Sequence, residues 1–117
     1  MQLSIKYLPG TSDMIPGNLV ITCEDDEAQA VMQSINQELK WMEAKRIHAY
    51  KDGSKMSKTE MPHFSMHAEA DCYSFNSSHI SDVCLAARQL VGQEKQNITI
   101  TTAMIDKLEQ ELYKYNA

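Results

Sequence analysis

The pattern that most constrains the fold is a set of apolar residues at helical spacing, preceded by four consecutive acids. The acids are Glu24, Asp25, Asp26 and Glu27, and the apolar residues after them are Ala28, Val31, Met32, Ile35, Leu39 and Met42. Negative charge is favourable at a helix N-terminus, and intervals of three and four residues place the apolar side chains on one face. We therefore expect a helix that begins near these acids and packs against a core.

Two strands are expected before this helix. Residues 1–8 and residues 18–23 alternate between apolar and polar side chains, and a Pro-Gly pair ends the first run. Alternation of this kind is typical of a strand with one buried face. The apolar positions are Met1, Leu3, Ile5, Tyr7, Leu19, Ile21 and Cys23. The first part of the chain is therefore predicted to be a hairpin followed by a helix.

The rest of the chain is predicted to follow a similar order. Residues 46–51 are interpreted as a short third strand and residues 62–75 as a long fourth strand, separated by a turn at Asp52-Gly53 and a polar loop. A second helix, capped by Ser77 or Ser78, then carries Ile80, Val83, Cys84, Ala87, Leu90 and Val91 and ends near Gly92. A final helix is expected over residues 102–115, and residues 97–101 fit either a short strand or the start of that helix.

This order predicts an α+β fold. We expect a two-layer sandwich in which an antiparallel sheet of about four strands, in ββαββα order, carries helices on one face, with an extra C-terminal helix. The length of 117 residues and the apolar content of 43% suit a single domain over residues 1–117. The residues expected beneath the helices are Leu3, Ile5, Leu19, Ile21, Ile47, Phe64, Met66 and Cys72.

The predicted strand over residues 62–75 is unusually rich in reactive side chains. Strand alternation assigns Phe64, Met66, Ala68, Ala70 and Cys72 to the core face, and His63, Ser65, His67, Glu69, Asp71, Tyr73 and Phe75 to the outer face. The Cys72 thiol is then on the opposite face from the two histidines. A cysteine–histidine nucleophile pair within this strand is therefore not expected.

Two alternatives use this outer face. His63, His67, Glu69 and Asp71, with His48 from the neighbouring strand, offer metal ligands for a metal-dependent hydrolase, although a solvated polar face explains the same residues. The other alternative is an RNA or single-strand binder in which Tyr50, Tyr73 and Phe75 stack bases beside Arg46 and Lys6. No helical zinc motif supports the first alternative, and the negative net charge opposes the second.

The segment from Asp52 to Thr59 resembles the KMSKS loop of class I aminoacyl-tRNA synthetases. That family also requires a HIGH motif and a parallel nucleotide-binding sheet, and the chain contains neither pattern. The resemblance therefore implies no synthetase activity here. Lys55 and Lys58 within the segment, together with Lys51 directly before it, instead indicate a basic loop on an acidic protein.

Composition narrows the functional classes further. The chain has no run of about eighteen apolar residues and no basic segment followed by an apolar one at its start. Its three cysteines lack CxxC spacing, which favours reduced thiols and a cytoplasmic location. Walker, GxGxxG and nucleophile-elbow motifs are absent from the sequence. We therefore expect a protein that is not an enzyme and that needs no cofactor or tightly bound metal.

The distribution of charge points to a basic macromolecular partner. Residues 1–44 contain seven acids and two bases, and they account for most of the net charge of −5. An acidic surface complements the basic cleft of a nuclease, a toxin or another nucleic-acid-binding enzyme and steers association with it. The expected partner-binding residues are Glu24, Asp25, Asp26, Glu27, Glu38, Trp41, Lys55 and Lys58. We therefore expect an inhibitor or immunity-type protein, with a homodimer as an open alternative and direct nucleic-acid binding not expected.

Overall fold

The computed structural model describes residues 1–11, 16–51 and 66–115, and for residues 44–51 it describes the backbone alone. The strands are β1 (Leu3–Leu8), β2 (Asn18–Cys23), β3 (His67–Glu69), β4 (Cys72–Asn76), β5 (Glu94–Lys95) and β6 (Ile98–Thr99). The helices are α1 (Asp26–Lys51), the 3-10 turn η2 (Ser77–His79), α2 (Ile80–Gln89) and α3 (Thr102–Tyr113). The predicted α+β class and the ββαββα order are confirmed, and β5 and β6 form an additional small sheet before α3.

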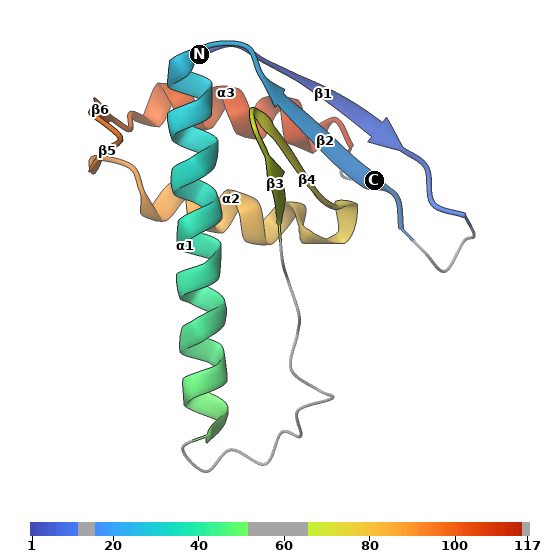
Figure 1. Cartoon of the computed structure of the whole chain (residues 1–117), viewed down its shortest axis with the longest axis vertical. Coiled ribbons are helices and arrows are strands. Elements are labelled where there is room, and N and C mark those ends of the chain that lie inside the picture. Colours follow the sequence, from blue (N-terminus) through green and yellow to red (C-terminus); the bar gives the residue numbers. More distant parts are fainter. Residues whose placement is uncertain (12–15, 52–65, 116–117) are drawn as a thin grey trace.

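The main sheet is antiparallel and has the strand order β1-β2-β4-β3. Leu19 pairs with Phe75 and Ile21 pairs with Tyr73 across the two central strands, and all four side chains lie in the core. Helical residues from α1, α2 and α3 complete the same core, so the helices cover one face of the sheet. Figure 1 shows α1 running across α2 and α3, with the sheet beside them.

The edge strand β1 is held by the C-terminal helical region. The ring of Tyr115, which follows α3, stacks on that of Tyr7 with centroids 6.1 Å apart. The Tyr115 hydroxyl also donates a hydrogen bond to the backbone carbonyl of Ile5 at 3.4 Å. Leu3 and Ile5 are half-buried against the core, as the alternating pattern predicted. The first strand and the end of the described chain therefore stabilise each other.

The predicted third strand is wrong, because residues 46–51 belong to α1. The segment from Trp41 to Lys51 contains no glycine or proline, and its alanines, lysines, arginine and glutamate favour helix. The helix therefore continues past Met42 to Lys51 and is 26 residues long in all. The expected turn at Asp52-Gly53, the loop that carries Lys55 and Lys58, and Phe64 lie outside the described residues. The burial of Ile47 is not described either, because only the backbone of that residue is.

The predicted long strand is a hairpin in the residues that the structure describes. The chain turns at Ala70 and Asp71, where Ala70 adopts a positive φ of 54°, and it returns as β4. The turn reverses the alternation, so Tyr73 and Phe75 are buried at 3% exposure each, and Cys72 lies half-buried on the opposite face. Met66 is buried and His67 is exposed, as expected from the part of the pattern that precedes the turn.

The second helix begins differently from the sequence prediction. Asn76, rather than Ser77 or Ser78, caps η2, and its side-chain carbonyl accepts a hydrogen bond from the Ser78 backbone at 2.9 Å. Gln96 and Asn97 both have positive φ and form the turn between β5 and β6. Of the two assignments left open for residues 97–101, the short strand is therefore correct, as β6 (Ile98–Thr99). The last helix is capped by Thr101 and ends at Tyr113, two residues before the predicted end.

We predict that Ala70→Gly stabilises the protein. A non-glycine residue in the left-handed region costs roughly 1–2 kcal/mol, and the added flexibility of glycine in the unfolded chain offsets part of the gain. The net increase in the free energy of unfolding is expected to be about 0.5 kcal/mol, measured by urea denaturation.

The matched control is Ala68→Gly in the neighbouring strand β3. Its backbone is not among the residues with positive φ, so glycine there should lower the free energy of unfolding by roughly 0.5–1 kcal/mol. Equal destabilisation by both substitutions would contradict the assigned conformation of Ala70.

Candidate functional site

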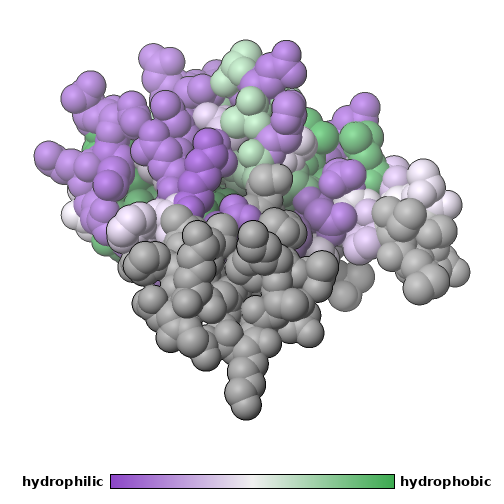
Figure 2. Space-filling view, turned by 60° about the horizontal axis from the view of Figure 1, so that its bottom comes forward, coloured by the Kyte–Doolittle hydropathy of each residue, from purple (hydrophilic) through white to green (hydrophobic). Residues whose placement is uncertain are grey.

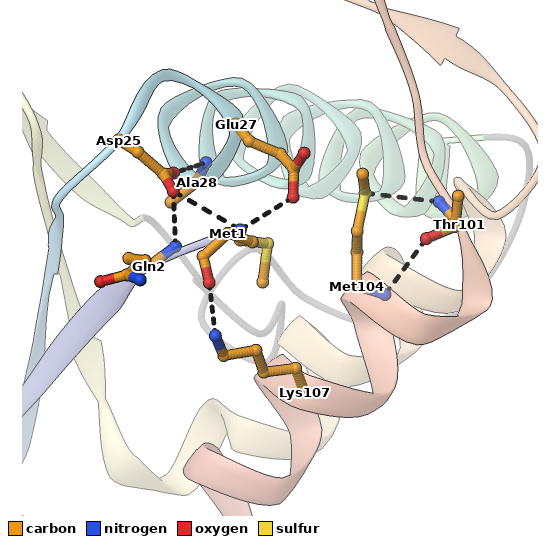
Figure 3. A network of polar contacts seen from close by, with 8 residues as sticks. All are labelled: Met1, Gln2, Asp25, Glu27, Ala28, Thr101, Met104 and Lys107. Atoms are coloured by element: carbon orange, nitrogen blue, oxygen red, sulfur yellow. Dashed lines mark hydrogen bonds and ion pairs between the residues drawn. The ribbon is translucent and has the colours of Figure 1, made fainter.

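The acids at the start of α1 divide into structural and exposed groups. Asp25 caps the helix, since one carboxylate oxygen accepts a hydrogen bond from the Ala28 backbone at 2.8 Å and the other accepts one from the Gln2 backbone at 2.9 Å. The Met1 amino group lies 3.4 Å from Asp25 and 3.0 Å from Glu27 (Figure 3). Asp25 and Glu27 therefore fasten the beginning of β1 to α1.

This junction also reaches α3. The Lys107 ammonium donates a hydrogen bond to the Met1 backbone carbonyl, and the nearby cap of α3 joins the Met104 backbone to the Thr101 hydroxyl at 3.2 Å (Figure 3). The hydrogen bond from Ala28 is the main reason why the pKa of Asp25 is lowered. The side-chain contact with Glu27 is the largest cause that raises the pKa of the Met1 amino group.

The remaining acids border a shallow depression that we call the acidic hollow. It has a volume of about 280 Å³ and is lined by Cys23, Glu24, Asp25, Asp26, Gln29 and Asp71. Asp71 reaches this place because its backbone carbonyl accepts a hydrogen bond from the Cys23 backbone at 2.9 Å. The sequence grouped Asp71 with His67 and Glu69, whereas the turn between β3 and β4 brings it to the start of α1.

The acidic hollow is strongly negative. Glu24, Asp26 and Asp71 are exposed, and within the described residues no basic side chain pairs with them. Burial raises the pKa of the Cys23 thiol to about 11, with further contributions from the charges of Asp71 and Asp25. Cys23 is therefore protonated at neutral pH and is not suited to act as a nucleophile.

The other expected partner-binding residues lie farther along the chain. Glu38 is half-buried, and it lies about 18 Å from Asp26 along the axis of α1, given a rise of about 1.5 Å per residue. Trp41 is 56% exposed on α1. Lys55 and Lys58 lie outside the described residues. The expected acidic surface is therefore concentrated at the N-terminal end of α1 instead of covering the whole helix.

A second depression, which sequence reasoning missed, lies between α1 and the β3–β4 hairpin. We call it the amide groove, because Gln29, Gln33, Asn36 and Gln37 line one side of it together with Lys40. Ala68, Glu69, Ala70 and Tyr73 line the opposite side, and the volume is about 310 Å³. The helical spacing of these amides was visible in the sequence, but it resembles an ordinary solvated face.

Hydrogen bonding in the amide groove is incomplete. The Gln29 side chain donates to the Ala70 carbonyl at 2.9 Å, which connects the helix to the hairpin turn. The side-chain carbonyl oxygens of Gln29 and Asn36 are buried, and no hydrogen-bond partner for them is found in the part of the chain that the structure describes. Asn36 itself is only 8% exposed. A buried polar atom without a partner is destabilising, so these two amides are candidates for contact with a ligand.

The two alternative sites predicted from the sequence do not assemble as expected. The Nε2 atom of His67 lies 3.8 Å from a carboxylate oxygen of Glu69, and the two side chains are highly exposed, at 76% and 84%. Asp71 lies apart from them, in the acidic hollow. Across residues 1–11, 16–43 and 66–115, no three histidine, cysteine, aspartate or glutamate side chains are grouped for a metal ion. His63 and the side chain of His48 lie outside the described part of the chain.

The predicted base-stacking surface of Tyr50, Tyr73 and Phe75 does not form as expected. Tyr73 and Phe75 are core residues, because the turn at Ala70 reverses the alternation, and buried rings cannot stack on bases. Lys6 is exposed on β1, and the side chains of Arg46 and Tyr50 lie outside the described residues. On the face drawn in Figure 2, the described residues are mostly hydrophilic, with smaller hydrophobic patches.

No family model matches the chain, and the searches of curated proteins and of solved structures give no match either. Within the described residues, no helix is both long enough and apolar enough to cross a membrane.

We predict that replacing Asp25 has a pH-dependent effect on stability. Its pKa is lowered in the folded protein, so the charged carboxylate stabilises the fold above the unfolded pKa of about 3.9, and this contribution is lost as the pH falls through the folded pKa. Asp25→Asn keeps a neutral capping oxygen but removes the charge. Urea denaturation should therefore show a larger difference from wild type at neutral pH than at pH values below about 3.

Glu94→Gln serves as the control, because Glu94 lies on β5 and is exposed. It should change stability little. A difference between wild type and Asp25→Asn that stays constant as the pH is lowered would contradict the assigned role of the Asp25 charge.

Proposed function

We propose that the protein is a non-enzymatic binding protein that inhibits or neutralises a basic macromolecular partner. The partner is a protein such as a nuclease, a toxin or a nucleic-acid-binding enzyme, and the function is of the inhibitor or immunity-protein type. The observation that carries the proposal is the meeting of Glu24, Asp26 and Asp71, from two distant parts of the chain, in one exposed hollow without a basic partner among the described residues.

The acidic hollow suits a partner that normally holds phosphate. Carboxylates that converge from two segments present several negative charges to one basic cleft, in the place where a nucleic-acid backbone would lie. The net charge of −5 adds a long-range attraction to such a partner and opposes direct binding to nucleic acid. This mode of action needs no nucleophile or cofactor in the protein, because occupation of the partner's site is sufficient.

Trp41 supplies a second contact in this proposal. Tryptophan is enriched among the residues that dominate binding energy at interfaces, and the Trp41 side chain is largely accessible on α1. In this proposal the acidic hollow speeds association with the partner, whereas the Trp41 contact slows dissociation of the complex. A cytoplasmic location, where the thiols of Cys23, Cys72 and Cys84 stay reduced, belongs to the same proposal.

The electrostatic part of the proposal is tested with the partner that co-purifies from the native host. Asp26→Lys should slow association on the order of tenfold at low ionic strength, and the effect should shrink as salt is added. Stopped-flow measurements across a salt series give these rates. Asp25 and Glu27 are left unchanged, because they hold β1 and α1 together.

The matched control is Glu94→Lys, which makes the same change of charge on the exposed part of β5. Equal rates for Asp26→Lys and Glu94→Lys would show that net charge alone matters, and they would overturn the assignment of the acidic hollow as the binding surface.

A separate prediction concerns Trp41→Ala. Loss of a central tryptophan contact is expected to cost about 2 kcal/mol of binding free energy, which is about a thirtyfold weaker affinity. Calorimetric titration with the same partner measures it. Leu85→Ala is the control, since Leu85 is similarly exposed, at 50%, but lies on α2. Equal affinities for wild type and Trp41→Ala would remove Trp41 from the interface.

A further inference from the structure

The free edge of β3 borders the amide groove. In the sheet order, β3 is terminal and pairs only with β4, so within the described residues no strand occupies its other side. A loop of two residues, Ala70 and Asp71, joins the strands, and therefore Glu69 and Cys72 close the hairpin as a hydrogen-bonded pair. Hydrogen-bonded and non-hydrogen-bonded pairs alternate, so the backbone N–H and C=O of Ala68 point to the free edge.

The opposite wall of the groove carries side chains that hydrogen-bond to peptide groups. Amide side chains offer both a donor and an acceptor, as a backbone does. Gln29, Gln33 and Asn36 form a row of amides along about 10 Å of α1, and the backbone from His67 to Ala70, which comprises β3 and the first turn residue, also spans about 10 Å over three residue steps. The row of amides and this opposite wall therefore match in length, with the groove between them.

The unpartnered oxygens of Gln29 and Asn36 require hydrogen-bond donors. Asn36 is nine-tenths buried at the wall of the groove, and solvent does not reach its unpartnered oxygen. A small rotation or a flip of its amide presents either a donor or an acceptor to the groove. Backbone groups of an extended chain would satisfy these amides on one side and Ala68 on the other.

We propose that the amide groove binds an extended segment of the partner protein, which pairs with the free edge of β3 as an additional strand. This is the β-augmentation mode of peptide recognition. The inference rests on the proposed function, because the segment belongs to the basic partner described above. It adds the conformation of the bound segment and the place where its backbone lies.

The charges around the groove define the kind of segment. The acidic hollow adjoins the groove at Gln29, which lines both depressions, and at the Ala70-Asp71 turn. At the other end, Lys40 lines the groove from a later turn of α1. The segment therefore carries a lysine or arginine at the end near Asp26 and Asp71, and neutral or acidic residues near Lys40.

The first experiment uses a library of random linear peptides displayed on phage, selected against the whole protein. The expected result is a set of peptides that share a basic residue at one end and that bind with affinities measurable by titration. Deuterium exchange followed by NMR should then show strong slowing at the Ala68 amide when a selected peptide is added, because the added strand accepts that hydrogen bond.

Two variants separate the groove from a general loss of structure. Asn36→Leu removes the buried amide at similar size, so its urea midpoint should equal or exceed that of wild type, whereas peptide affinity should fall at least tenfold. Ala68→Pro removes the outward N–H without removing a ladder hydrogen bond, and it should also weaken binding at least tenfold. The matched control, Gln110→Leu, changes an exposed amide on α3 and should leave affinity unchanged.

Several results would overturn the inference. Selection without enriched peptides, or enriched peptides that bind Asn36→Leu and wild type equally, would exclude the groove as a peptide site. Slow exchange at Ala68 without peptide, increasing with protein concentration, would assign the edge to a second copy of the chain. Slowing at amides distant from β3 would place the peptide elsewhere.

The proposed function can fail independently of this inference. The co-purified partner is therefore titrated with Asn36→Leu, Ala68→Pro and Asp26→Lys in parallel. A loss with Asp26→Lys alone would retain the acidic hollow and reject strand addition. A loss with the two groove variants alone would retain strand addition and reject the electrostatic function.

Discussion

The left-handed backbone of Ala70 determines the arrangement of the sheet after it. A turn at this residue sends the chain back along β3, and the reversal places Tyr73 and Phe75 among the core residues of β2. The same turn places the backbone carbonyl of Asp71 where it accepts a hydrogen bond from the Cys23 backbone. It also places the carbonyl of Ala70 where it accepts one from the Gln29 side chain. Both depressions on the surface therefore depend on one residue in a conformation that glycine adopts more easily.

Much of the fold follows from local patterns in the sequence. The bounds of β2, the acids before α1 and the apolar face of α2 were all predictable, since periodicity alone assigns them. The hairpin between β3 and β4 was not predictable in the same way, because Glu69-Ala70-Asp71-Cys72 lacks the glycine or asparagine that usually marks such a turn. Continuous alternation then predicted a single strand, and the faces of Cys72, Tyr73 and Phe75 were assigned wrongly.

The candidate site was harder to predict than the fold, because tertiary contacts divide residues that are equivalent in sequence. The sequence pattern does not distinguish the four adjacent acids. In the structure, Asp25 and Glu27 hold the start of β1, whereas Glu24 and Asp26 are exposed beside Asp71. The amide groove joins a helix to a hairpin that is far from it in sequence. Periodicity identifies which residues share a helix face, but it does not identify what lies opposite that face.

The contacts between β1 and the C-terminal helical region have a consequence for the order of folding. Lys107 binds the Met1 carbonyl and Tyr115 stacks on Tyr7, so β1 obtains these contacts from a helical region that follows it by about a hundred residues. Contacts of such sequence separation form late and slow the folding of a small domain. During synthesis, the outer edge of the nascent sheet therefore stays without these contacts until α3 and Tyr115 emerge, and this is the interval in which association between chains competes with folding.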